Sequence, residues 1–284
     1  MPGTRDKNLR SGDLHEELGI LLLKGIAVVA PVPRQEDVGN DAFATLLKQA
    51  GNRKLIADIS FLVQFKSSSV TCLTFSKKDE LEWLYALEIP LFIGRVSFST
   101  ASIELYTTIN LQQVILEFGY SQITVLFNDS NVRSDKAGER TINLGEPIHT
   151  WSIYDLCSDG FYENYFAVIQ PHVEMLRRNI NLRRVHTLEQ LSWKTGEPPK
   201  IFSHLIQTQA ESNVQDTLEA LVPLVRRLFF EVSVSDRYEA LPTLNAFCDL
   251  ITRWGVHPDK LGCFRQILEL DAMQIAHAEP VWHI

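Results

Sequence analysis

The segment Ile59-Ser60-Phe61-Leu62-Val63-Gln64-Phe65-Lys66 has the alternation of a half-buried β-strand. Residues 59, 61, 63 and 65 are all apolar and point to one face of such a strand. Gln64 and Lys66 therefore share the opposite face, where their polar tips emerge side by side. This segment predicts a strand that packs on a core with one face and presents an amide and an ammonium group with the other.

The segments around this strand predict an α/β N-terminal domain. Apolar periodicity favours strands at 26–32, 56–66, 70–75, 91–98, 102–107 and 123–127, and helices at 13–24, 77–87 and 111–118. Asp13 with Glu16 three residues later is typical of a helix N-cap with a reciprocal glutamate. The Asp37-Val38-Gly39-Asn40-Asp41 segment favours a tight turn, in which Gly39 allows an unusual backbone angle.

The rest of the chain predicts a mainly α-helical C-terminal region. Helical periodicity extends over 161–181, 188–193, 214–232, 240–254 and 258–278. The segment between the two parts is polar and rich in turn-forming residues. We therefore expect a polar tail at 1–10, an α/β domain at 11–128, a linker or long loop at 129–150, and the helical region at 151–284.

Composition places the chain among globular proteins, with 45% hydrophobic and 22% charged residues. No apolar run reaches the ~20 residues that span a bilayer, so no membrane segment is expected. Acidic residues separate Arg10 from the leucines that follow it, which argues against a secretory signal. The four cysteines are far apart in the sequence, and this spacing favours reduced thiols of a cytoplasmic protein.

Charge and missing motifs narrow the functional classes. The net charge is −8, and both halves of the chain are acidic, which disfavours tight nonspecific binding to nucleic acid. The sequence contains no nucleotide-binding glycine loop, no hydrolase nucleophile elbow and no H-E-x-x-H zinc motif. The eight histidines are scattered, so each is interpreted as a surface or core residue.

One set of residues has the chemistry of phosphodiester hydrolysis: Glu17, Asp41, Gln64 and Lys66. Carboxylate and amide oxygens suit Mg²⁺ or Mn²⁺, and a lysine beside the ion can orient water and stabilise negative charge. On a helical wheel, Glu17 falls at the margin of the apolar stripe, whereas Glu16 lies opposite it. The alternatives are an ordinary Asp/Gly/Asn turn at Asp41 and two solvated glutamates.

The sequence resembles the PD-(D/E)XK nuclease superfamily in the order of three features. These are a helix that carries Glu, then D-x-G-x-D, then Q-x-K at the end of a strand. More narrowly, residues 12–107 resemble an uncharacterised prokaryotic domain family of that superfamily. The resemblance implies a restriction-endonuclease-like mixed sheet flanked by helices. It also implies metal binding by Asp41, Gln64 and Glu17, with Lys66 as the catalytic lysine. Gln64 would stand at the acidic position of the motif, and Glu17 would restore the missing carboxylate.

The resulting hypothesis is an Mg²⁺- or Mn²⁺-dependent endodeoxyribonuclease of prokaryotic defence or DNA processing. Arg177, Arg178, Arg183 and Arg184 could contact a DNA backbone, and a homodimer would align two such clusters along one duplex. These arginines would equally complement a helix dipole. Two alternatives remain. The first is an inactive nuclease-fold protein that binds a protein partner through its C-terminal helices or binds nucleic acid. The second is a helical regulatory protein with an unrelated α/β domain.

Overall fold

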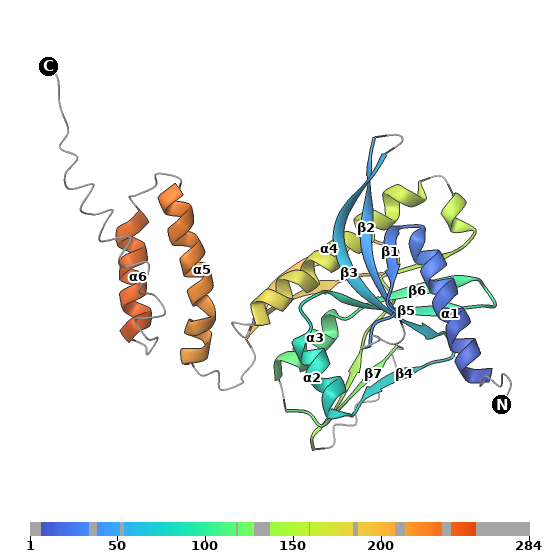
Figure 1. Cartoon of the computed structure of the whole chain (residues 1–284), viewed down its shortest axis with the longest axis horizontal. Helices are drawn as coiled ribbons and strands as arrows, with labels where there is room; N and C mark the ends of the chain where they lie inside the picture. The colour runs from blue at the N-terminus through green and yellow to red at the C-terminus, as the bar shows by residue number, and fades with distance from the viewer. Residues whose placement is uncertain are drawn as a thin grey trace. The chain divides into compact units, whose positions relative to one another are not determined.

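A six-stranded mixed sheet organises the first part of the chain (Figure 1). Its strands, in spatial order, are β1 (Ala27–Pro31), β2 (Ala42–Ala50), β3 (Lys54–Ser67), β5 (Leu91–Ser97), β6 (Ser102–Thr107) and β9 (His149–Ser152). β3 and β5 are parallel, and the other neighbours are antiparallel. Parallel neighbours need a crossover connection, which contains the short strand β4 (Cys72–Phe75) and helix α2 (Lys78–Ala86). The expected α/β domain with a mixed sheet is confirmed.

The computed structural model describes residues 7–33, 39–51, 54–117, 119–127, 137–158, 160–183, 187–207, 214–234 and 240–253. The chain divides into two compact units, residues 1–183 with 187–208 and residues 184–186 with 209–284. Among the described helices, none has both the length and the apolar character needed to cross a bilayer.

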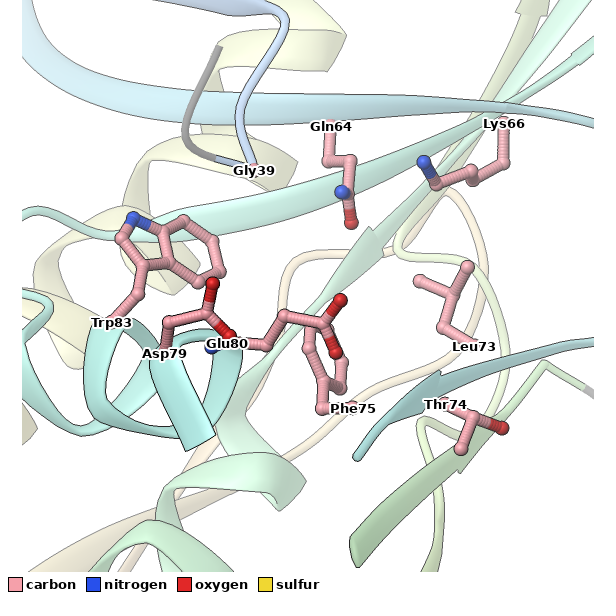
Figure 2. A pocket seen from close by; sticks show the side chains of 9 residues that line it. All are labelled: Gly39, Gln64, Lys66, Leu73, Thr74, Phe75, Asp79, Glu80 and Trp83. Carbon is pink, nitrogen blue, oxygen red and sulfur yellow. Dashed lines mark hydrogen bonds between the residues drawn. The ribbon is translucent and has the colours of Figure 1, made fainter. Parts of the chain in front are cut away.

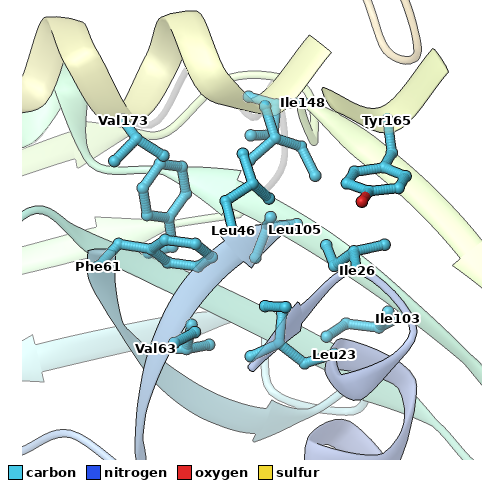
Figure 3. Close-up of a cluster of buried hydrophobic side chains, with 14 of the residues drawn as sticks. Leu23, Ile26, Leu46, Phe61, Val63, Ile103, Leu105, Ile148, Tyr165 and Val173 are labelled. Atoms are coloured by element: carbon cyan, nitrogen blue, oxygen red, sulfur yellow. The ribbon is translucent and has the colours of Figure 1, made fainter. Parts of the chain in front are cut away.

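Helices α1 (Lys7–Lys24) and α4 (Phe161–Leu182) cover one face of the large sheet. The core between these layers contains the apolar side chains that alternate along β2 and β3, including Leu46, Phe61 and Val63 (Figure 3). Two hydrogen bonds connect these helices to strands of the sheet. Trp151 Nε1 of β9 donates to Leu22 O of α1 at 3.1 Å, and the Tyr165 hydroxyl of α4 donates to Leu47 O of β2. A short 3₁₀ turn, η2 (Asp155–Cys157), connects β9 to α4.

The other face of the large sheet is covered by α2, α3 (Ile109–Glu117) and a three-stranded sheet. The small sheet contains β4, β7 (Gln122–Leu126) and β8 (Glu139–Asn143) in the order β4-β7-β8. Leu91 and Ile93 of β5 point into this second core, whereas Phe92 points into the first. The central strand β5 is therefore packed on both faces.

Two segments differ from their predicted form. Residues 188–193 lie largely in strand β10 (Thr187–Ser192) instead of a helix, and α1 begins at Lys7, so Asp13 is not its N-cap. Residues 42–50, for which the sequence predicted no element, form strand β2. β10 pairs with β11 (Lys200–Gln207), which the sequence did not indicate. Strand β8 lies inside the segment expected as a linker, and the first compact unit continues beyond that segment through α4 to β11.

The second unit contains the helices α5 (Val214–Val234) and α6 (Leu241–Arg253). They pack through Val222 against Ile251 and through Val225 and Phe229, with Cys248 at the margin of both clusters. A helical C-terminal end is therefore confirmed. The helix expected at 258–278 lies outside the described residues.

Candidate functional site

A pocket of about 500 Å³ opens between β3 and the first turn of α2 (Figure 2). It lies on the face of the sheet that α2 and β4 cover. Its lining combines four charged or amide side chains with two aromatic rings; the lining residues are Gly39, Gln64, Lys66, Leu73, Thr74, Phe75, Asp79, Glu80 and Trp83. This combination of polar groups and apolar walls is typical of a ligand site.

The alternation of β3 places Gln64 and Lys66 on one face of the strand, as the sequence predicted, and both side chains line this pocket. Phe61, Val63 and Phe65 point to the other face, where the core under α1 buries them. The contact with α1 is close, because a Cβ atom at Gly19 would lie only 2.5 Å from Phe65 Cδ1. One strand thus separates a packed face from a face that lines the pocket.

Asp41 lies immediately before β2 and is fixed to the same part of β3. Its backbone N–H donates to Val63 O at 3.0 Å, and its carboxylate Oδ2 accepts a hydrogen bond from Phe65 N. Phe65 stands between Gln64 and Lys66 in the chain. The structure therefore brings Asp41, Gln64 and Lys66 together around one short segment of β3, although Asp41 itself does not line the pocket.

The turn before Asp41 has the predicted glycine conformation. Gly39 has φ of +105°, a backbone angle that side-chain-bearing residues rarely adopt. A Cβ atom there would lie 3.1 Å from Trp83 Cη2, so the glycine also allows the turn to rest on the indole ring. Asp37 and Val38 lie outside the described residues.

The amide of Gln64 has an unsatisfied oxygen. Within the described part of the chain, Oε1 is buried and accepts no hydrogen bond. A buried polar atom without a partner costs about 1–3 kcal/mol, so such an atom in a native site calls for a role. Lys66, the other polar residue of this face, makes no ion pair or side-chain hydrogen bond with the described residues.

Glu17 is located differently from the other three predicted residues. It is exposed on α1, the helix that packs against the Phe65 side of the sheet, and it does not line the pocket. In the described ranges, no group of three or more His, Cys, Asp and Glu side chains converges as a metal site. The acidic and amide side chains that share the pocket with Lys66 are instead Gln64, Asp79 and Glu80.

Asp79 and Glu80, which sequence reasoning did not select, form the α2 side of the pocket. Glu80 Oε2 accepts from Ser76 N and Lys77 N, both at 3.2 Å, and Oε1 accepts from Lys77 Nζ at 2.9 Å. The side-chain hydrogen bond from Lys77, followed by the two backbone hydrogen bonds, lowers the pKa of Glu80. In the sequence, acidic residues at the start of a predicted helix indicate a helix N-terminus and do not indicate a pocket.

Two of the four arginines expected to contact nucleic acid have partners within the fold. Arg183 donates to Tyr85 O at 3.3 Å and to Leu87 O, which fastens α4 to the end of α2. Arg178 pairs with Glu189 at 3.1 Å. Arg177 is exposed, and Arg184 lies outside the described residues.

Comparisons of the chain with protein-family models, with curated proteins and with solved structures find no match.

Proposed function

We propose that the chain is a metal-dependent endonuclease that hydrolyses phosphodiester bonds in DNA, in prokaryotic defence or DNA processing. The observation that carries the proposal is the position of Gln64 and Lys66 in one pocket, with Asp41 hydrogen-bonded to the residue between them. The mixed sheet flanked by helices, with Asp41 directly before β2 and the Gln64-x-Lys66 segment on the neighbouring strand β3, is also what the resemblance to restriction-endonuclease-like nucleases implies.

The donor set fits Mg²⁺ or Mn²⁺. These hard cations take oxygen ligands, and Mg²⁺ is usually held by one or two carboxylates, waters and substrate phosphates, without a full protein cage. The Asp41 carboxylate and the orphaned Gln64 Oε1 are such oxygens. When bound, the ion polarises the phosphoryl group and lowers the pKa of its water.

The residues of the chain have separate tasks in this proposal. The Phe65 N–H holds the Asp41 carboxylate in one orientation, so the ligand is preorganised. Lys66 donates to a nonbridging oxygen of the phosphodiester and stabilises the charge that develops there. Hydrolysis adds water across one P–O bond and releases a phosphomonoester and a hydroxyl group.

The test is cleavage of plasmid, linear and single-stranded DNA by the purified chain with Mg²⁺ or Mn²⁺. Lys66→Ala should lower the cleavage rate by about a hundredfold, the usual cost of removing one group that stabilises transition-state charge. Lys78→Ala is the matched control, because this lysine pairs with Glu82 on the exposed side of α2. Equal rates for the wild-type protein and Lys66→Ala would place the chemistry elsewhere.

One observation favours a second candidate function, binding of a protein partner. Among the described residues of the second unit, Leu224, Leu228 and Phe230 of α5 are more than half exposed. Exposed apolar residues on one helix are typical of protein interfaces. An inactive chain that associates with a partner through α5 would fit this candidate, and the cleavage assay distinguishes the two.

A further inference from the structure

A second pocket lies at the start of α4. Its volume is about 280 Å³, and its walls come from β9, from the turn η2 and from the first turn of α4. α4 covers the face of the large sheet that it shares with α1, whereas Gln64 and Lys66 point to the face that α2 covers. The two pockets have no lining residue in common, so this one is separate from the proposed nuclease site.

α4 begins in this pocket without a capping side chain. Its N-cap residue is Gly160, with φ of +79°, and within the described residues no side chain caps the first turn. The N–H groups of a first helical turn have no partners inside the helix, and the 22 residues of α4 align their peptide dipoles with the positive end here. Such an end attracts an anion. Many helices share this property, so a site needs a further observation.

That observation is a buried histidine whose two ring nitrogens lack partners. His149 is only 8% exposed, and in the described part of the chain neither Nδ1 nor Nε2 has a hydrogen-bond partner. Its ring is stacked on that of Phe161, the first residue of α4, with the ring centroids 6.4 Å apart. His149 thus lines the pocket beside the helix N-terminus. Burial lowers the pKa of His149, so at neutral pH the ring offers one donor and one acceptor.

Asp155 restricts which anion this pocket can accept. Its Oδ2 accepts hydrogen bonds from Ser152 N and Ser152 Oγ, both at 2.7 Å, and these bonds lower the pKa of Asp155. The carboxylate therefore stays ionised on the wall of the pocket, where it repels an anion that has no proton to share. Hydrogen phosphate keeps an O–H group at neutral pH and can donate it, whereas sulfate cannot.

We propose that this pocket binds a hydrogen phosphate group. Its oxygens would accept hydrogen bonds from the first-turn N–H groups of α4 and from His149, and its O–H would donate to Asp155. A free phosphate ion and the terminal group of a phosphomonoester share this chemistry. The assignment is independent of the proposed nuclease function, because it uses none of the residues around Lys66.

The experiment is titration calorimetry of the full chain with inorganic phosphate, glycerol phosphate and sulfate. Inorganic phosphate should bind at least about tenfold more tightly than sulfate, the value of one hydrogen bond to a charged group. The tighter ligand of inorganic phosphate and glycerol phosphate identifies the free ion or the phosphomonoester as the occupant. His149→Phe keeps the stacked ring and removes both nitrogens, so it should weaken phosphate binding by at least about tenfold. Its thermal unfolding midpoint should not fall below that of the wild-type protein.

Ser158→Asp is a second test that leaves the core intact. Ser158 is exposed and lines the pocket, so the new carboxylate should repel phosphate from the helix end and abolish binding. Thr71→Asp, the matched control, adds the same charge at an exposed residue outside both pockets and should leave the affinity unchanged.

Three results would overturn the assignment. The first is a wild-type chain that binds no phosphate, or that binds sulfate equally well. The second is wild-type phosphate affinity in both His149→Phe and Ser158→Asp. The third is loss of phosphate binding in Lys66→Ala, which would place the phosphate in the β3 pocket. In each case the cleavage assay would still decide the nuclease function separately.

Discussion

The side chain of Gln64 should lower the stability of the fold, so replacing it with an apolar side chain of similar length should raise the free energy of unfolding. Its buried Oε1 accepts no hydrogen bond in the described part of the chain, and Lys66, in the same pocket, makes no ion pair with the described residues. Gln64→Met keeps the length of the side chain and removes both polar atoms, so the desolvation cost of the orphaned oxygen disappears. For a half-buried residue we take the lower part of the range of about 1–3 kcal/mol, namely about 1 kcal/mol.

This gain is measurable in a thermal melt. A stabilisation of 1 kcal/mol raises Tm by about 2–4 °C in a unit of 150–250 residues. The same substitution should abolish Mn²⁺-dependent cleavage, because a thioether is a poor ligand for a hard cation. Stability and activity would then change in opposite directions, as expected where a functional site stores an unfavourable contact.

The control is Gln64→Glu, which restores a carboxylate at this position. Without metal it should unfold at or below the wild-type temperature, since a buried charge is costly, and Mn²⁺ should raise its Tm more than that of the wild-type protein. A Gln64→Met variant that is less stable than the wild-type protein and still cleaves DNA would refute the reasoning. Gln64 Oε1 would then neither destabilise the fold nor be needed for cleavage.

Two further predictions concern stability alone. Burial lowers the pKa of His172 to about 3, so this side chain stays neutral in the folded chain while it takes up a proton in the unfolded chain. The free energy of unfolding should therefore fall by about 2 kcal/mol between pH 7.5 and pH 5. Urea melts recorded across this range should show a flatter pH dependence for His172→Gln. Arg183→Gln should remove the hydrogen bonds to Tyr85 O and Leu87 O and lower the free energy of unfolding by about 1–3 kcal/mol; an unchanged urea midpoint would show that α4 does not hold the end of α2 through this residue.

The parts of the fold that could be predicted are those where local pattern and tertiary environment agree. The alternation at 59–66 is visible because one face of β3 is buried along its whole second half. Residues 42–50 are different: Ala44, Leu46, Leu47 and Lys48 favour a helix by propensity, yet the segment pairs with β1 on one side and β3 on the other. Strand pairing across the chain overrides such local preferences, and a single sequence does not display it.

The site was partly predictable for the same reason. The shared face of Gln64 and Lys66 follows from the periodicity of a single strand, whereas Asp41 was selected through the resemblance, next to a turn in which Gly39 has a positive φ. Asp79 and Glu80 could not be placed, because their sequence pattern is that of any helix start. Only the α2 crossover between the parallel strands β3 and β5 turns this helix end toward Lys66.

The charges of the pocket also bear on how a nucleic acid could enter it. The chain carries a net charge of −8, and Arg178 and Arg183 are engaged within the fold. Asp79 and Glu80 would repel a phosphate that approached the pocket without a cation. If the proposed site is correct, the divalent ion is therefore needed for substrate binding as well as for chemistry, since it turns a repulsive pocket into one that attracts phosphate. Substrate affinity would then depend on the ion at this one point, and far less on the broad basic surface that DNA-binding proteins use.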